Sequence, residues 1–332
     1  MSRSFSGLWR RAALMLCAAS VSSAAYAEKV ARPRLNSLEY RLSWGAGAVR
    51  ADGAYRKGAT GAGVTVAMID TGLELSSGLF AHLSPASIDL VQREKPDDGG
   101  SNHGRQTASL IAGALDGKGT FGLAYDATLL SIRADRDGSC QRICSFDPAV
   151  LANAIDYAVE HRARVIGLPL SSYRRLPVIE QALERAVASG ALIVAAAGNN
   201  GDEEPVWPAR YATDARFANA MIVAGASTPQ GRLAGWSNKA GAAAERYLLA
   251  PGQNVIVDCS TRYCSLVSGT SYSVSYIAGA AALMMGQYPE LSSSEVAALL
   301  LDGARDLRSN GTDLESGRGI LDVARSLRLA AR

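Results

Sequence analysis

The sequence predicts an α/β fold, in which an open, mainly parallel sheet carries helices on both faces. Short apolar runs typical of buried strands alternate along the chain with longer helix-like segments. Such alternation is typical of parallel strands whose connections are helices. No internal repeat, low-complexity tract or Pro/Gly-rich linker divides the chain, so a single domain over residues 43–332 is the simplest organisation.

The elements follow from these patterns in order along the chain. The predicted strands are mostly apolar runs, as a sheet covered on both faces requires: Val64–Ile69, Thr128–Arg133, Val165–Leu170, Ala191–Ala196 and Met221–Ala226. The predicted helices are Thr107–Ala114, Pro148–His161, Pro177–Ser189, Ser273–Met285, Ser293–Leu301 and Ile320–Leu329. Residues 28–42 are basic without regular periodicity and are expected to form an irregular N-terminal arm.

Residues 1–27 have the features of a signal peptide. A basic start with Arg3, Arg10 and Arg11 precedes an apolar stretch over Ala12–Val21, and Ala25-Tyr26-Ala27 forms a small-x-small cleavage site. The apolar stretch is too short to span a bilayer. Cys17 allows a lipoprotein alternative, which Leu16 before it disfavours. We therefore expect an exported protein, either secreted or periplasmic.

The charge balance after signal removal gives no support for a nucleic-acid or membrane-surface partner. The whole chain has 34 basic and 31 acidic residues, and the signal takes away three arginines and no acid, which leaves 31 of each. A formally neutral chain does not attract polyanions over long range. No later apolar stretch is long and clean enough to predict a membrane span.

Four cysteines remain after the signal peptide, in the local pairs Cys140/Cys144 and Cys259/Cys264. An oxidising compartment favours two short-loop disulfides, although four cysteines allow three pairings. A metal site is the weaker alternative, because neither spacing is C-x-x-C and no histidine is close in sequence. We assign no metal ligand.

Ser271 is the first candidate for chemistry. Gly269-Thr270-Ser271 opens the small and apolar run predicted as a helix. A serine at this place lies in the positive field of the helix N-terminus, which favours an oxyanion. The same tripeptide also occurs in ordinary turns and helix caps, so Ser271 needs partners elsewhere to be a nucleophile.

Three other residues lie where such partners would be. Asp70 ends the first predicted strand, at the edge where open sheets place their sites. His103 leads from a Gly/Ser/Asp loop into a helix, whereas His82 and His161 lie in contexts typical of solvated side chains. Asn199 follows a buried strand in Ala-Gly-Asn-Asn-Gly, where its amide can donate to developing negative charge. Each has an ordinary alternative as a cap or turn residue.

Taken together, these four motifs resemble those of the subtilisin-like serine peptidases, the subtilases. The order Asp, His, Ser, the spacing and the predicted elements agree over residues 44–323. The resemblance implies the subtilisin-like three-layer fold and a catalytic triad of Ser271 as nucleophile, His103 as base and Asp70 as its orienting acid. It also implies Asn199 as oxyanion donor.

The sequence departs from the family pattern at several positions. Arg105 and Gln106 follow His103-Gly104, Tyr272 follows the nucleophile, and Ser275 replaces the proline usual in the nucleophile helix. An unpaired Arg105 close to His103 would lower the pKa of the imidazole.

The segment that pairs with substrate in this family also differs. It has the sequence Gly-Leu-Pro-Leu-Ser-Ser over residues 167–172, and the resemblance implies Leu170, Ser171 and Ser172 as substrate-binding residues. Pro169 lacks a backbone donor and the serines add side chains where glycines are usual. The acidic run Asp202-Glu203-Glu204 favours basic substrates or is simply a solvated loop.

The sequence therefore predicts an exported serine endopeptidase that acts on protein or peptide substrates through an acyl-enzyme. The alternatives are a catalytically silent subtilase-like domain that binds peptides or a partner protein, and a peptide ligase or cyclase on the same site. Only about 15 residues separate the cleavage site from the start of the resemblance, where the family often has a folding prodomain. No cofactor is required, calcium sites are not assignable, and the sequence does not indicate an oligomeric state.

Overall fold

A seven-stranded sheet, parallel throughout, forms the centre of the fold in a computed structural model of the chain. The structure describes Met1 and residues 32–74, 78–91, 101–141, 144–260, 262–307 and 311–332. The predicted signal peptide and the first residues of the predicted arm lie outside these ranges, apart from Met1. In the described ranges, no helix has the length and apolar content needed to cross a bilayer.

The strand order in the sheet is β2-β3-β1-β4-β5-β6-β7, and a separate antiparallel hairpin pairs β8 with β9. The strands are β1 Thr65–Asp70, β2 Ile88–Asp89, β3 Thr128–Arg133, β4 Val165–Leu168, β5 Leu192–Ala196, β6 Met221–Ser227, β7 Tyr247–Pro251, β8 Val255–Val257 and β9 Ser265–Val267. The predicted parallel sheet is confirmed. The edge strands β2 and β7 and the hairpin were not expected from the sequence.

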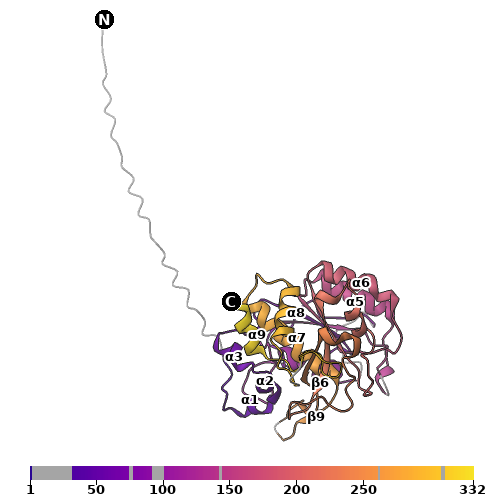
Figure 1. The fold of residues 1–332 in the computed structure, drawn as a ribbon. Helices are drawn as coiled ribbons and strands as arrows, with labels where there is room; N and C mark the ends of the chain where they lie inside the picture. The colour runs from indigo at the N-terminus through magenta and orange to yellow at the C-terminus, as the bar shows by residue number, and fades with distance from the viewer. Residues whose placement is uncertain (2–31, 75–77, 92–100, 142–143, 261, 308–310) are drawn as a thin grey trace. The chain divides into compact units, whose positions relative to one another are not determined.

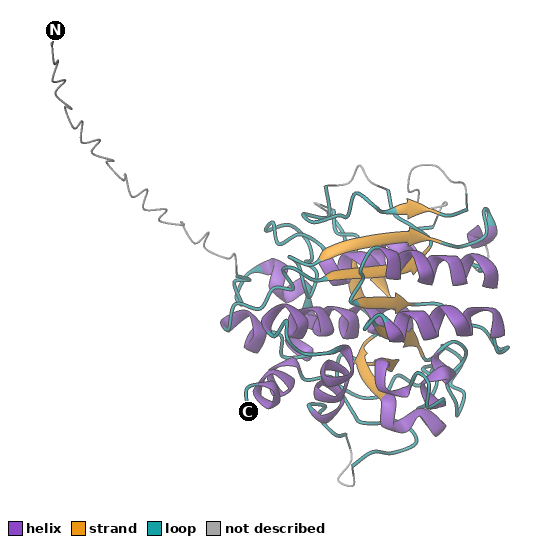
Figure 2. Ribbon diagram, turned by 90° about the horizontal axis from the view of Figure 1, so that it is seen from above, coloured by secondary structure: helices purple, strands orange, loops and turns teal. Residues whose placement is uncertain are grey.

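Helices cover both faces of the sheet, which gives three layers (Figure 2). The helices are α1 Leu38–Leu42, α2 Trp44–Ala48, α3 Asp52–Arg56, α4 His103–Ala112, α5 Pro148–Glu160, α6 Pro177–Ala188, α7 Thr270–Gln287, α8 Ser293–Asp302 and α9 Val323–Ala330. Helices α5 and α6 lie side by side on one face (Figure 1), and α4, α7 and α8 pack on the other. This arrangement confirms the fold class.

The two faces follow from the alternation of side chains along each strand. In β1, Val66 and Met68 belong to the apolar cluster beneath α4, α7 and α8. Ala67 and Ile69 belong to the cluster beneath α5 and α6. Because both faces are covered, the strand is apolar at consecutive positions rather than at alternate ones.

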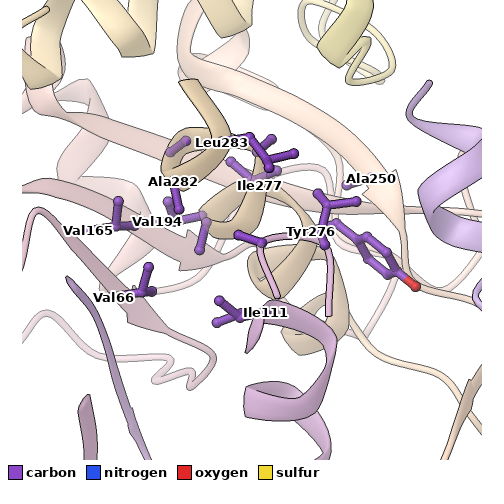
Figure 3. Close-up of a cluster of buried hydrophobic side chains, with 14 of the residues drawn as sticks. Val66, Ile111, Val165, Val194, Ala250, Tyr276, Ile277, Ala282 and Leu283 are labelled. Atoms are coloured by element: carbon purple, nitrogen blue, oxygen red, sulfur yellow. The ribbon is translucent and has the colours of Figure 1, made fainter. Parts of the chain in front are cut away.

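Helix α7 lies in the middle of the core. It runs for 18 residues, of which those from Thr270 to Met285 are buried. Figure 3 shows its Ile277, Ala282 and Leu283 side chains over the valines of neighbouring strands. Gly279 permits this close packing, since a Cβ there would lie 2.9 Å from Cβ of Leu123. The composition of α7, small and apolar all round, is that of a helix with no solvent face.

Two predicted elements were wrong in part. The arm over residues 28–42 is not irregular in its second half: Ser37 caps α1, and the buried Glu39 carboxylate accepts the N–H groups of Asp116 (3.1 Å) and Gly117 (2.9 Å). The last helix begins at Val323 and not at Ile320. Ile320 instead exchanges two backbone hydrogen bonds with Arg305, which holds it in extended structure.

A buried arginine stabilises the edge of the sheet beside Asp70. Arg133 is the register partner of Asp70 and has a side chain with no solvent exposure. Its guanidinium donates to Asp89 (2.7 Å), Asp135 (2.9 Å) and Asp137 (3.1 Å). Burial by itself lowers the pKa of Arg133, but the hydrogen bonds to the three carboxylates outweigh burial and raise it above the ordinary value, so the group stays charged.

We expect Arg133→Met to lower the free energy of unfolding by about 3–5 kcal/mol, because it leaves buried carboxylates without their cation. Asp137→Asn is the matched control, since the Asp137 side chain is 62% exposed and the pair is worth less than about 1 kcal/mol. Urea unfolding of both variants measures the difference. An equal loss of unfolding free energy in the two variants would contradict the prediction that the buried pairs of Arg133 contribute more than the exposed one.

Candidate active site

Asp70 is a buried carboxylate at the carboxyl end of β1, with 2% of its surface exposed. Its oxygens accept the backbone N–H of Thr71 and the hydroxyl of Thr107, each at 2.7 Å. Thr107 was not among the predicted site residues. It lies one helical turn after His103 on α4, so the i, i+4 spacing was the available signal.

His103 is the first residue of α4 and lies against Asp70. Its Nδ1 is 2.7 Å from Oδ1 and 3.0 Å from Oδ2 of Asp70. Burial lowers the pKa of His103, but the charge of Asp70 and the hydrogen bond to it outweigh burial, so the pKa is raised. A proton held on Nδ1 by the carboxylate leaves the lone pair of Nε2 as the acceptor of the neutral ring.

Ser271 lies in the first turn of α7, with 8% of its surface exposed. Its hydroxyl donates to the carbonyl oxygen of Pro169 at 3.0 Å. Pro169 follows β4, the strand next to β1, so the serine lies at the same sheet edge as Asp70. Within the described residues, the hydroxyl is bonded to this carbonyl rather than to His103.

Asn199 is exposed just after β5 and is oriented by Thr270. Its side-chain oxygen accepts both the backbone N–H and the hydroxyl of Thr270, each at 2.9 Å. Because the oxygen is occupied, the amide NH₂ is the end of the side chain left to act as a donor. The structure thus brings Asn199 to the residue that precedes Ser271.

The predicted substrate-binding segment divides into two parts. Ser172 exchanges two backbone hydrogen bonds with Trp207, of 2.7 and 2.9 Å, so its own peptide groups are already paired. Ser171 is exposed, and Leu170 is buried with 7% exposure.

Charged residues near the site have partners of their own. Arg105 pairs with Asp258 at 3.0 Å, so the condition for a lowered His103 pKa, an unpaired arginine, is not met. Glu203 pairs with Lys239 at 2.7 Å, and the carboxylate of Glu204 accepts the N–H of Ala242 at 3.1 Å. These contacts favour the second alternative for the acidic run, a solvated loop.

The two expected disulfides, Cys140–Cys144 and Cys259–Cys264, are both present. No group of three or more His, Cys, Asp or Glu side chains that could hold a metal ion occurs in the described ranges. Calcium sites therefore stay unassigned.

Comparison with known proteins agrees with this geometry. The model of the family described as "Subtilase family" matches residues 61–319. Subtilisin BL of Lederbergia lenta is 32% identical over 271 residues, which cover 81% of this chain and 93% of that protein. Subtilisin DY of Bacillus licheniformis is 29% identical over 286 residues, covering 85% and 97%.

The chain belongs to the subtilase family. Its similarity to these relatives shows that it is a serine-type endopeptidase whose substrates are proteins or peptides. Two solved structures share the fold of this subtilase, each with a TM-score of 0.69. They are the prenylagaramide maturation protease PagA, 23% identical over 84% of this chain and 97% of that one, and a mutant of the protease domain of PatA, 24% identical over 81% and 95%.

Ser275 of this subtilase is buried in α7, and its hydroxyl has no hydrogen-bond partner in the described part of the chain. Its neighbour Ser273 is equally buried but donates to the carbonyl of Ala250 at 3.0 Å. The two serines share one helix, so replacing either with alanine changes helix propensity by the same amount.

We expect Ser275→Ala to raise the free energy of unfolding by about 1 kcal/mol, because an unsatisfied buried hydroxyl is removed. Ser273→Ala is expected to lower it by about 1 kcal/mol through the lost hydrogen bond. Thermal or urea unfolding of the two variants checks the opposite signs. A loss of stability in Ser275→Ala would show that its hydroxyl has a partner in solution.

Proposed function

We propose that this subtilase is exported and cleaves peptide bonds through Ser271, His103 and Asp70. The observation that carries the proposal is the Asp70–His103 pair. A carboxylate bonded to Nδ1 leaves Nε2 of a partly buried histidine as a base at the sheet edge where Ser271 lies. The proposed chemistry requires no cofactor.

In the first step, the Ser271 oxygen attacks the substrate carbonyl while its proton passes to Nε2 of His103. The hydroxyl first leaves the Pro169 carbonyl, which needs only rotation about one staggered side-chain bond. The imidazolium, stabilised by Asp70, then protonates the leaving amine and an acyl-enzyme remains. Water attacks this ester with His103 again as base, which releases the acid and restores the serine.

The tetrahedral oxyanion would be stabilised by the amide of Asn199 and the backbone N–H of Ser271. The Asn199 oxygen is held by Thr270, which directs the remaining amide hydrogens outward as donors. The Ser271 N–H lies in the first helical turn, where backbone donors have no intrahelical acceptor. In peptidases of this family, loss of such a side-chain donor costs on the order of 3 kcal/mol of barrier.

Leu170 and Ser171 are the proposed partners of the substrate backbone. Pro169 has no N–H and Ser172 is paired with Trp207, so pairing over this segment is shorter than an uninterrupted strand allows. Export is proposed from the signal-like residues 1–27, and two disulfides are typical of an oxidising compartment, secreted or periplasmic.

The decisive experiment is covalent labelling of the folded protein with a fluorophosphonate. We expect one adduct on Ser271 by peptide mass spectrometry, because only an activated serine attacks the phosphorus. Ser271→Ala is expected to take no label, and peptide products should gain the mass of water, which distinguishes hydrolysis from ligation or cyclisation. Folded protein with neither label nor hydrolysis would instead support the silent peptide-binding alternative.

The raised pKa of His103 predicts the pH dependence of hydrolysis. Only the neutral imidazole accepts the serine proton, so kcat/KM should rise with pH through an apparent pKa above the ordinary value of about 6.5. In Asp70→Asn, burial continues to lower the pKa of His103 while the charge that raises it is gone. The acid limb of the pH–rate profile therefore moves to lower pH. In triad peptidases the same change lowers kcat by about 10⁴-fold.

A pH–rate profile of the wild type and of Asp70→Asn measures this shift. Asp126→Asn is a suitable control, because Asp126 lies beside His82 and should leave the profile unchanged. An acid limb that stays in place in Asp70→Asn would mean that another group sets the pKa of His103.

A further inference from the structure

Three departures from the family pattern, Arg105, Gln106 and Tyr272, are linked to one acidic residue, Tyr272 through Gln106. The Asp258 carboxylate accepts Arg105 Nη1 on Oδ1 at 3.0 Å and Gln106 Nε2 on Oδ2 at 2.5 Å. The hydroxyl of Tyr272 donates to Oε1 of Gln106 at 2.9 Å. These four side chains form one continuous network, which we call the Asp258 network.

The backbone that carries Asp258 is constrained. Asp258 directly follows β8 with a φ of 51°, in the left-handed region that few non-glycine residues occupy. The next residue, Cys259, is joined to Cys264 by a disulfide across the β8–β9 hairpin. The Asp258 side chain is 14% exposed, so water competes little with its two partners, Arg105 and Gln106.

Gln106, on α4, uses both ends of its amide: the oxygen accepts from Tyr272 on α7, and the NH₂ donates to Asp258 in the β8–β9 hairpin. The carboxylate of Asp258 requires the NH₂ end, and the Tyr272 hydroxyl, a donor here, requires the oxygen. Burial and the nearby Asp70 and Asp258 carboxylates raise the pKa of Tyr272, so its hydroxyl keeps its proton. The amide thus has one orientation that satisfies both neighbours.

The hydrogen bond between Gln106 and Tyr272 joins α4 to α7 close to both proposed catalytic side chains. Gln106 is on α4, three residues after His103, and Tyr272 is on α7, directly after Ser271. The rings of Tyr272 and His103 lie 5.9 Å apart between centroids. A displacement of one helix relative to the other therefore changes the separation of Ser271 and His103.

We propose that Asp258, Gln106 and Tyr272 are positioning residues, which hold the helices of His103 and Ser271 at the separation that proton transfer needs. This inference rests on the proposed function, since it assigns residues that support the same base and nucleophile. Reaction rates are sensitive to such placement, because a shift of about 1 Å costs on the order of 10²-fold. Arg105 secures Asp258 from the other side.

The test compares Tyr272→Phe, which keeps the ring and removes one hydroxyl, with Tyr263→Phe in the β8–β9 hairpin that carries Asp258. Tyr263 is 70% exposed and should leave kinetics unchanged. For Tyr272→Phe we expect kcat and the rate of fluorophosphonate labelling to fall about tenfold, the scale of one lost hydrogen bond in a barrier, with KM within about twofold. Urea unfolding confirms that both variants are folded.

Asp258→Asn is a second, independent test, and combining it with Tyr272→Phe gives a double-mutant cycle. If Asp258 acts through Gln106 on Tyr272, the double variant loses no more kcat than the more damaged single variant. Independent, multiplying losses would overturn the network, as would an unchanged kcat in folded Tyr272→Phe. A change in KM alone would show Tyr272 to be a direct substrate contact and overturn the positioning role.

The outcome also separates this inference from the proposed function. A wild type that labels on Ser271 while Tyr272→Phe labels at the same rate would reject the positioning role and leave the peptidase mechanism intact. A folded wild type that neither labels nor hydrolyses would overturn both.

Discussion

The burial of α7 against the parallel sheet is the constraint on which the rest of the structure depends. Its residues from Thr270 to Met285 are buried, so neither its position nor its rotation has much freedom. Small residues such as Gly279 let it lie close to neighbouring segments. Thr270 then ties the first turn to Asn199 by two hydrogen bonds, so the packing of the core determines where Ser271 stands.

The sheet order explains why the site residues converge. Strands β1, β4 and β5 are neighbours, and their carboxyl ends supply Asp70, Pro169 and Asn199 in turn. Parallel strands direct these ends to one edge of the sheet. Helix α4 begins at this edge with His103, and α7 begins there with Thr270, directly before Ser271. A buried carboxylate at this edge is tolerated because Thr71, His103 and Thr107 satisfy it.

The unusual residues around the site are best understood together. Arg105, Gln106 and Tyr272 each differ from the family pattern, yet every one of them has its partner in the Asp258 network. A partly buried arginine or glutamine without partners would cost free energy, whereas the paired set satisfies its polar groups. Ser275 is different, since nothing in the described structure compensates its buried hydroxyl.

The sequence by itself indicated five of the seven strands of the sheet, the helices from α4 to α9 and the four candidate residues Asp70, His103, Asn199 and Ser271. Those predictions rest on local periodicity and on motifs whose residues are contiguous. The tertiary structure decided the bond from Ser271 to Pro169, the docking of Glu39 and the Asp258 network. Gln106 lies 152 residues from Asp258 and 166 from Tyr272 in the chain. No local pattern indicates which of many polar side chains meet at that range; only the packing of α4, α7 and the hairpin selects them.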